Sequence, residues 1–192
     1  MDTSEVVRCR QVNPIMMEVL GTRNNKAVVF IDIDGVMADC SHRLPYLEKE
    51  DYDKFYGIAM ASDSVHVDWP ITEMMLRGIV ASHDEIIVKF LTGRPKSTEQ
   101  ICKLWIRDHI PFFRCCLNDS TSMLMRKDGD KRVAFRVKWE LIEEYLEKGE
   151  VDDDDENYTP CDFYMIDDDY RNIAYCHDRM HERFNERLFG VV

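Results

Sequence analysis

Two short apolar runs in the sequence end abruptly in polar residues, a pattern typical of buried strands in an α/β protein. The first begins at Val28 and stops at Gly35, and the second occupies residues 85–91. Both are rich in Val, Ile and Phe and are too short for typical helices, which favours strands covered on both faces. A glycine allows the chain to turn sharply where the first run ends. The pattern therefore predicts strands whose carboxyl ends carry polar side chains.

Apolar positions at helical spacing follow each of these runs. Pro70 suits the first helical position, and Ser97 with Gln100 predicts a capping box for a helix that continues to about His109. The first of these helices carries its apolar positions at Ile71, Met74, Met75, Ile79 and Val80. A later amphipathic helix is marked by Val133, Val137, Leu141, Ile142, Tyr145 and Leu146. Alternating strands and helices predict an α/β protein with a doubly wound (Rossmann-like) parallel sheet and right-handed connections.

Two further strands complete the predicted sheet. We expect a third strand at residues 112–117 and a fourth at residues 163–166, which ends in three consecutive aspartates. The remainder of the chain is predicted to be helical, since residues 177–192 have few strand features. The predicted first and fourth strands are therefore both followed by aspartates at their carboxyl ends.

The length and the remaining segments favour a single domain, residues 1–192, with one small insertion. A chain of 192 residues that is 45% hydrophobic can bury one substantial core. Residues 39–69, polar and aromatic, are predicted to form a small cap-like insertion after the first strand, close to the active site. Residues 12–20 are expected to form a short helix ending at Gly21, and residues 151–157 an acidic loop.

Charge and cysteine content narrow the classes of function. The net charge of −12 repels polyanions, so any contact with nucleic acid requires a local basic patch. Seven cysteines without a C-x-x-C pair favour reduced thiols and a cytoplasmic location. No stretch approaches the roughly 20 apolar residues that span a bilayer, so neither export nor a membrane partner is expected.

Asp32 and Asp34 are the most informative residues in the chain. Two carboxylates in one crevice repel each other unless a cation lies between them or one is protonated. The simplest interpretation is a Mg²⁺ site in which one carboxylate is a nucleophile and the other transfers protons. A calcium-binding EF-hand is disfavoured because Gly35 comes too early in the loop. A purely structural role is also disfavoured, because it leaves unpaired charge at the end of a buried strand.

Three other candidates are weaker when taken singly. Thr92 lies at a strand end, where a threonine is usually a cap or turn residue. Lys138 lies near the start of an amphipathic helix, where a lysine is normally solvated. Asp167 and Asp168 could belong to a solvated acidic loop, although their position matches that of Asp32. Together these groups are the carboxylates, hydroxyl and ammonium that phosphoryl transfer requires.

In this combination the chain resembles the haloacid dehalogenase-like (HAD) superfamily of aspartate-dependent phosphohydrolases. Four family motifs match in order over about residues 27–175: Asp32-Ile33-Asp34-Gly35, Thr92 in Leu-Thr-Gly-Arg, Lys138, and Ile166-Asp167-Asp168. Within this resemblance, Asp34 favours a phosphatase over a dehalogenase. A leaving alkoxide needs a proton, which a second carboxyl group can donate, whereas a leaving halide needs none.

The resemblance also implies a role for each matched residue. Asp32 is expected to attack phosphorus and form an aspartyl-phosphate, and Asp34 to protonate the leaving oxygen and then activate water. Thr92 and Lys138 are expected to hold the phosphate oxygens. The implied Mg²⁺ ligands are Asp32, the backbone carbonyl of Asp34, and Asp167 or Asp168.

Within the superfamily, the chain is most similar to the 3′-phosphatase domain of polynucleotide kinase-phosphatases. The supporting segments are Ala38-Asp39, His42-Arg43-x-x-Tyr46, Leu91-Thr92-Gly93-Arg94 and Met125-Arg126-Lys127-Asp128-Gly129-Asp130. Arg94 and Arg126 are the candidate substrate-binding residues, because planar guanidinium groups can clamp a phosphate. For Arg43 and Arg132 we favour a surface cation or a partner for one of the many carboxylates.

Three functions remain open at this level. The first is hydrolysis of phosphate from polynucleotide 3′ ends or nucleotides, and the second is a general phosphatase of small metabolites or nucleoside monophosphates. The third is a non-catalytic phosphate-binding or docking module of the HAD fold. The sequence contains no Gly-x-x-x-x-Gly-Lys-Ser/Thr phosphate loop, so any accompanying kinase or ligase activity is expected from a separate chain.

Overall fold

A parallel sheet of five strands forms the centre of the computed structural model, which describes residues 26–49, 51–56, 62–117, 122–148 and 161–191. The strand order is β5-β4-β1-β6-β7, and every neighbouring pair is parallel. The bounds are β1 Lys26–Ile31, β4 Glu85–Pro95, β5 Met123–Arg126, β6 Cys161–Ile166 and β7 Leu188–Val191. The predicted α/β class and parallel sheet are therefore confirmed.

The central strand β1 divides the apolar interior into two cores. Successive side chains of a strand point to opposite faces, and here Val29 and Ile31 join one core while Val28 and Phe30 join the other. All four are at most 1% exposed, which explains why this stretch of sequence is continuously apolar rather than alternating.

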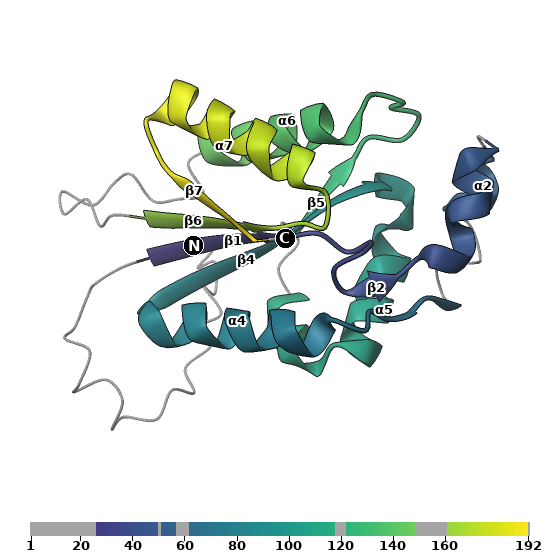
Figure 1. The fold of residues 1–192 in the computed structure, drawn as a ribbon, viewed down its shortest axis with the longest axis horizontal. Helices are drawn as coiled ribbons and strands as arrows, with labels where there is room; N and C mark the ends of the chain where they lie inside the picture. The colour runs from purple at the N-terminus through teal and green to yellow at the C-terminus, as the bar shows by residue number, and fades with distance from the viewer. Residues whose placement is uncertain (1–25, 50, 57–61, 118–121, 149–160, 192) are drawn as a thin grey trace, which may run out of the picture.

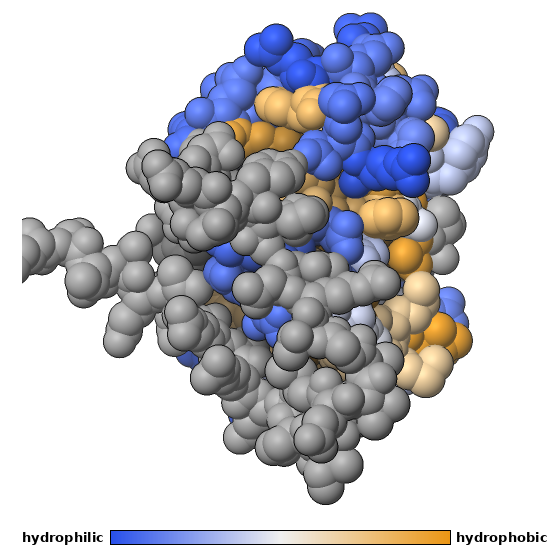
Figure 2. All heavy atoms as spheres, turned by 90° about the vertical axis from the view of Figure 1, so that its left-hand side faces the viewer, coloured by the Kyte–Doolittle hydropathy of each residue, from blue (hydrophilic) through white to orange (hydrophobic). Residues whose placement is uncertain are grey.

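Helices cover both faces of the sheet, as Figure 1 shows. On one face lie α4 (Trp69–Ser82) and α5 (Glu99–His109), and on the other lie α6 (Ala134–Glu147) and α7 (Tyr170–Phe184). Each helix contributes buried apolar residues to the core on its own side of the sheet. In Figure 2, the surface over α6 and α7 at the top of the view is mostly hydrophilic, as expected of the outer faces of amphipathic helices.

The segment after β1 extends beyond the carboxyl ends of the strands. It contains β2 (Ala38–Asp39), the 3₁₀ helix η1 (Ser41–Arg43), α2 (Leu44–Glu48), α3 (Tyr52–Phe55) and β3 (Ser64–Val65). The two short strands pair antiparallel, so the segment returns to its starting point before α4 begins. In Figure 1, β2 and α2 lie to the right of the sheet, on the side towards which β1 runs.

The predicted third strand at residues 112–117 is wrong. Residues Pro111–Leu117 form the 3₁₀ helix η4, and the strand β5 that pairs with β4 comes later, at Met123–Arg126. A short apolar run does not distinguish a strand from a buried turn of helix. Phe113 is fully buried and packs edge-to-face against Phe90, so the run is apolar because it belongs to the core.

The prediction that the carboxyl-terminal region is entirely helical is also wrong. After α7 ends at Asn185, which has the left-handed φ of 55°, the chain forms the edge strand β7. This strand contains Gly190, where an added Cβ would lie 2.1 Å from a side-chain atom of Ile173. Glycine lowers the strand signal in the sequence, yet the close approach of α7 requires it there.

Helix boundaries differ from prediction at one further point. The helix α5 is preceded by the 3₁₀ helix η3 (Lys96–Thr98), and Thr98 occupies the N-cap without a side-chain capping bond. The predicted capping box of Ser97 and Gln100 is therefore not formed, since Ser97 lies within the preceding turn. The backbone N–H of Ser97 instead donates to the carboxylate of Asp128 at 2.9 Å, and both residues line the pocket described below.

Some predictions concern segments outside the described residues, namely the helix at residues 12–20 and the acidic loop at residues 151–157. Within the part of the chain that is described, no helix combines the length and the apolar character needed to cross a membrane.

Candidate active site

The polar ends of β1, β4 and β6 meet at one edge of the sheet and border a pocket of about 1040 Å³. Carboxyl ends of parallel strands are the usual ligand-binding edge of α/β proteins. The lining includes Asp32 and Asp34 after β1, Gly93 in β4, Lys138 in α6 and Asp168 after β6. Residues separated by more than a hundred positions in the sequence therefore share one cavity.

Lys138 joins the first and last acidic strand ends. Its Nζ donates to Oδ2 of Asp32 at 2.6 Å and to Oδ2 of Asp167 at 2.5 Å. All three residues are at most 7% exposed. Val137 and Trp139 of α6 are both buried, and Trp139 belongs to the core on the α6 side of the sheet, so the intervening lysine is held at the sheet edge. Burial of the ammonium is compensated because it has two carboxylate partners.

Asp168 completes a group of three carboxylates with Asp32 and Asp167. One oxygen atom from each lies within 4.8 Å of the other two, an arrangement that could hold a metal ion. The turn after β1 makes room for Asp168: Gly35 has a φ of +80°, and a Cβ there would lie 2.1 Å from Oδ2 of Asp168. Glycine is thus required at this position for both its backbone conformation and its lack of a side chain.

Asn172, in the first turn of α7, supports this interpretation of the acidic group. Its amide nitrogen donates to Oδ1 of Asp167 at 2.8 Å, and the residue is 4% exposed. Its amide oxygen is buried without a hydrogen-bond partner among the described residues. A buried acceptor without a partner beside three carboxylates fits a hydrated divalent cation, which takes oxygen ligands directly or through water.

Burial changes the ionisation of the acidic group. Removal from water raises the pKa of Asp32 to about 7, a shift that the neighbouring Lys138 opposes and the nearby Asp167 adds to. Burial and the Asp167 charge also raise the pKa of Asp168. Lys138 stays protonated, because its two carboxylate partners raise its pKa despite the cost of burial. The cluster has an excess of negative charge that a divalent cation would offset.

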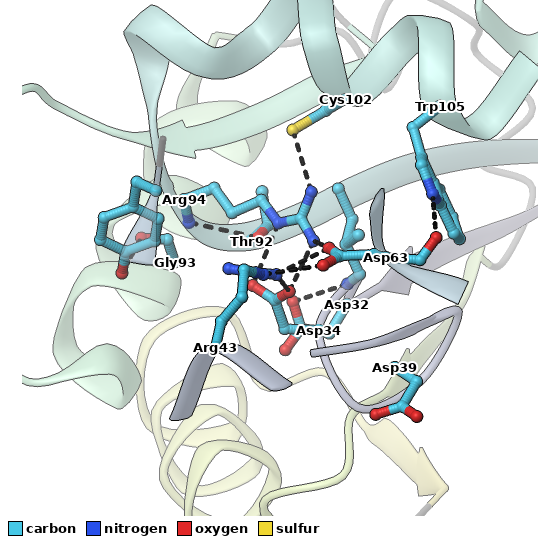
Figure 3. Close-up of polar contacts among 12 residues, drawn as sticks. Asp32, Asp34, Asp39, Arg43, Asp63, Thr92, Gly93, Arg94, Cys102 and Trp105 are labelled. Atoms are coloured by element: carbon cyan, nitrogen blue, oxygen red, sulfur yellow. Dashed lines mark hydrogen bonds and ion pairs between the residues drawn. The ribbon is translucent and has the colours of Figure 1, made fainter. Parts of the chain in front are cut away.

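Asp34 points away from this group and towards two arginines (Figure 3). Arg94 donates to both of its carboxylate oxygens, from Nε at 3.0 Å and from Nη2 at 2.5 Å, and Arg43 donates from Nη2 at 2.8 Å. Burial opposes ionisation here, but the two guanidinium groups hold the pKa of Asp34 below its usual value. The side chain of Asp34 is therefore not part of the three-carboxylate group, and its predicted metal contact, a backbone carbonyl, stays a prediction.

Asp63 is one of two residues of the candidate site, with Asn172, that the sequence did not reveal. It lies just before β3, and its carboxylate accepts bonds from Arg43 at 2.7 Å and Arg94 at 2.9 Å. Its backbone carbonyl accepts a bond from Trp105 Nε1 at 2.8 Å. Figure 3 shows the two guanidinium groups converging on Asp34 and Asp63, whose two negative charges balance the two positive ones.

The arginines occupy positions that differ from the sequence interpretation. Arg43 is indeed a partner for carboxylates, but it is fully buried rather than on the surface. Arg94 is 1% exposed and binds Asp34 and Asp63, so its predicted contact with substrate is not direct in this arrangement. Arg132 is a surface cation paired with acidic side chains, as expected.

Thr92 and Arg126 complete the predicted set. Thr92 is fully buried near the carboxyl end of β4, and its hydroxyl accepts a bond from the backbone N–H of Arg94 at 3.2 Å. Arg126 lines the pocket, and its Nε donates to the carbonyl of Gly93 at 2.9 Å. Its Nη1 donates to the carbonyls of Asp130 and Arg132. Arg126 therefore fixes the following loop against the end of β4.

Comparisons with known proteins agree with the fold. One chain of the solved structure of the Pnkp1/Rnl/Hen1 RNA repair complex superposes with a TM-score of 0.50 at 18% sequence identity. The match covers 86% of the present chain but only 42% of the other, so this protein spans less than half of that chain's length. No family model and no curated protein matches the sequence.

Proposed function

We propose that the protein is a Mg²⁺-dependent phosphomonoesterase of the HAD superfamily that works through an aspartyl-phosphate on Asp32. The observation that carries the proposal is the meeting of Asp32, Lys138 and Asp167 with Asp168 at one pocket edge. These residues come from three separate elements, and the four motifs that suggested them are far apart in the sequence. A buried lysine between two carboxylates adds little net stability, because the attraction is largely offset by the cost of removing the charges from water.

Each residue has a defined part in the proposed reaction. The carboxylate of Asp32 attacks the phosphorus atom, and the bond to the leaving oxygen breaks. Lys138 and Thr92 stabilise the negative charge on the phosphate oxygens during transfer. Bound Mg²⁺ would be held by Asp32, Asp167 and Asp168 and would supply further charge neutralisation. Water then attacks the aspartyl-phosphate, which releases inorganic phosphate and regenerates Asp32.

Asp34 is the proposed proton-transfer residue, and its environment favours its role as a base in the second step of the reaction. Arg43 and Arg94 hold it ionised, which suits a base that accepts a proton from the attacking water. Donation to the leaving oxygen requires Asp34 to gain a proton first. We propose that the negative phosphate group supplies the needed shift, because a like charge nearby raises the pKa of a carboxyl group.

The proposed substrates are polynucleotide 3′-phosphate ends or nucleotides. This rests on the segments shared with polynucleotide 3′-phosphatases and is consistent with the superposition on a chain of an RNA repair complex. By the same reasoning, a separate kinase or ligase is the proposed partner in end processing. The net charge of −12 favours the second candidate, a phosphatase of small metabolites, because it opposes the approach of long polyanions.

The deciding experiment measures phosphate release by the purified protein. We expect release from 3′-phosphorylated substrates with Mg²⁺ and none with a chelator. The Asp32→Asn variant should lose activity by roughly 10³-fold or more, because the nucleophile is gone. Binding of beryllium fluoride at Asp32 with Mg²⁺ provides a second readout. A folded protein that neither releases phosphate nor binds this mimic would instead be a non-catalytic module.

A further inference from the structure

The loop after β5 forms one wall of the pocket and contains two lysines that form no ion pair with another described residue. The loop, residues 126–132, also contains Arg126, Asp128, Asp130 and Arg132, which all line the pocket. The side chains of these four residues bond to other groups of the protein. Arg126 binds backbone carbonyls, and Arg132 pairs with Asp130. Asp128 accepts the bond from the backbone of Ser97. These contacts hold the loop in place against the end of β4 and the segment that precedes α5.

Lys127 and Lys131 are different from these neighbours. Both are exposed and line the pocket. Neither ammonium group forms a side-chain hydrogen bond or an ion pair with another described residue, although the charge of Lys127 helps to lower the pKa of Glu144 on α6. The chain has 37 acidic and 25 basic residues, yet these two ammonium groups lie beside the cavity without an ion pair among the described residues. Gly129, with a φ of +77°, makes the tight turn that separates them. The loop therefore offers positive charge to a ligand.

A second wall of the pocket is mostly apolar. It consists of Leu44 and Leu47 of α2 and of Phe55 with the neighbouring Tyr56, next to Asp51, which pairs with Lys54. Leu44 and Leu47 are 43% and 39% exposed, so they present apolar surface to the cavity opening. A wall of this kind can pack against the flat face of a nucleobase.

The two walls meet next to the candidate catalytic residues. The carbonyl of Gly93, one residue after Thr92, accepts bonds from Tyr56 Oη at 3.4 Å and from Arg126 Nε at 2.9 Å. A ligand whose terminal phosphate lies at Asp32 would therefore extend between the apolar and the basic wall. The pocket, at about 1040 Å³, is much larger than a single phosphate group requires.

We propose that Lys127 and Lys131 bind the phosphodiester next to the reacting 3′ end, while the apolar wall holds a base, so that the site selects a strand end over a free mononucleotide. The inference rests on the proposed phosphatase function. It adds the residues that bind the nucleic-acid strand next to the reacting phosphate. A small phosphate ester without a phosphodiester or a base cannot contact both walls. The local positive charge also offsets the repulsion expected from the acidic molecule.

The test compares substrates of increasing length with constant Mg²⁺: p-nitrophenyl phosphate, a nucleoside 3′-monophosphate, and a dinucleotide and an octanucleotide with 3′-phosphates. We expect kcat/KM to rise once a phosphodiester is present. In the Lys127→Gln/Lys131→Gln variant, KM for the oligonucleotides should rise by roughly fivefold or more, with p-nitrophenyl phosphate unaffected. The slope of log(kcat/KM) against log[salt] should become shallower by about 0.7 for each lysine removed.

The matched control is Lys103→Gln, which removes a surface lysine of α5 that pairs with Glu99 and does not line the pocket. It should leave the length dependence unchanged. Equal activity on the mononucleotide and the oligonucleotides, or an equal loss on all substrates in the double variant, would overturn the inference while leaving the phosphatase intact.

A binding measurement separates failure of the two proposals. Fluorescence anisotropy of a labelled 3′-phosphorylated octanucleotide requires no turnover. If no substrate is hydrolysed, the phosphatase proposal fails, and the double variant's effect on this binding still decides the role of the lysines. Binding that is several-fold weaker in the double variant than in Lys103→Gln supports the role, and unchanged binding overturns it.

Discussion

At the scale of single residues, the site contains two separate charge networks with different tasks. Lys138 links Asp32 and Asp167 beside the candidate metal site, whereas Arg43 and Arg94 link Asp34 to Asp63. The second network attaches the insertion to the strand ends, because Arg43 and Asp63 belong to the insertion. It also keeps Asp34 ionised. We therefore propose that Asp63 positions Asp34 through the two arginines that both carboxylates bind.

Replacing Asp63 by alanine should lower the free energy of unfolding by about 3–5 kcal/mol, because two buried guanidinium groups would share one carboxylate. Asp63 is 3% exposed, so water cannot easily substitute for the lost partner. Denaturant unfolding measures the change. Asp63→Asn should lose less, since the amide oxygen can still accept a bond.

The control for this prediction is Asp108→Ala, which removes an exposed aspartate paired with Arg107 on α5. Exposed ion pairs contribute little, so this variant should unfold like the original protein. Equal stability of the Asp63 and Asp108 variants would show that the buried network is not required for the fold.

Sequence reasoning located most of the site at this scale but not all of it. Asp32, Lys138 and Asp167 could be found because each belongs to a motif with a recognisable order. Asp63 and Asn172 could not, since one lies in a polar insertion and the other in an ordinary helix. Their importance depends on which buried charge or carboxylate they contact, and spacing in the sequence does not contain that information.

At the scale of elements, the turn between β1 and β2 determines whether the acidic group can assemble. Gly35→Ala forces a left-handed backbone conformation on alanine and places a Cβ against Asp168. We expect a loss of at least about 1–2 kcal/mol in the free energy of unfolding. Weaker Mg²⁺ binding, measured by calorimetry, should accompany the loss because Asp168 has to move.

Gly78→Ala provides the matched control within the same chain. Gly78 is an exposed glycine of α4, and a Cβ there would have nothing within 4 Å. Alanine should stabilise the helix by about 0.5–1 kcal/mol and leave Mg²⁺ binding unchanged. If both variants behaved alike, the positive φ of Gly35 and its contact with Asp168 would not be the cause of its effect.

Elements were predictable where the apolar pattern was long or strongly periodic. The strands β1 and β4 and the helices α4, α5 and α6 follow from such patterns. The strand β6 was predicted from four apolar residues followed by aspartates, and α7 only as part of a helical remainder. Other predictions from short runs were wrong. Residues 112–117 form a 3₁₀ helix, and the strands β5 and β7, of four residues each, were not predicted. Such short segments become strands because an existing sheet edge offers them hydrogen-bond partners, which is a tertiary effect.

At the scale of the whole molecule, pH should control how much the protein gains from Mg²⁺. Burial raises the pKa of Asp32 to about 7 in the folded chain, well above the usual value of about 4 for an aspartate in water. Between these values the folded state holds more protons than the unfolded one, so stability without metal falls as pH rises from about 4 to about 7. A divalent cation binds the ionised form, so the Mg²⁺-induced rise in Tm should be larger at pH 8 than at pH 5.5.

Thermal unfolding at the two pH values, with Mg²⁺ or a chelator, measures this effect. Asp34 does not interfere, because its lowered pKa affects stability only as pH falls below the ordinary carboxyl range. Asp168→Asn should reduce the Mg²⁺ effect, and the surface variant Asp108→Asn should not. A rise in Tm that is equal at both pH values would contradict Asp32 as a ligand.

The sequence by itself determined the α/β class, the parallel sheet and the order of the four acidic, hydroxyl and ammonium motifs, because these depend on local apolar patterns and on residue type. Only the tertiary structure decided that Arg43 and Arg94 would be buried against Asp34 and Asp63. It also decided that Lys127 and Lys131 would lie beside the pocket without forming an ion pair with any residue that the structure describes. The physical reason is that burial and charge pairing depend on distances between segments remote in the chain. Those distances exist only once both cores have formed.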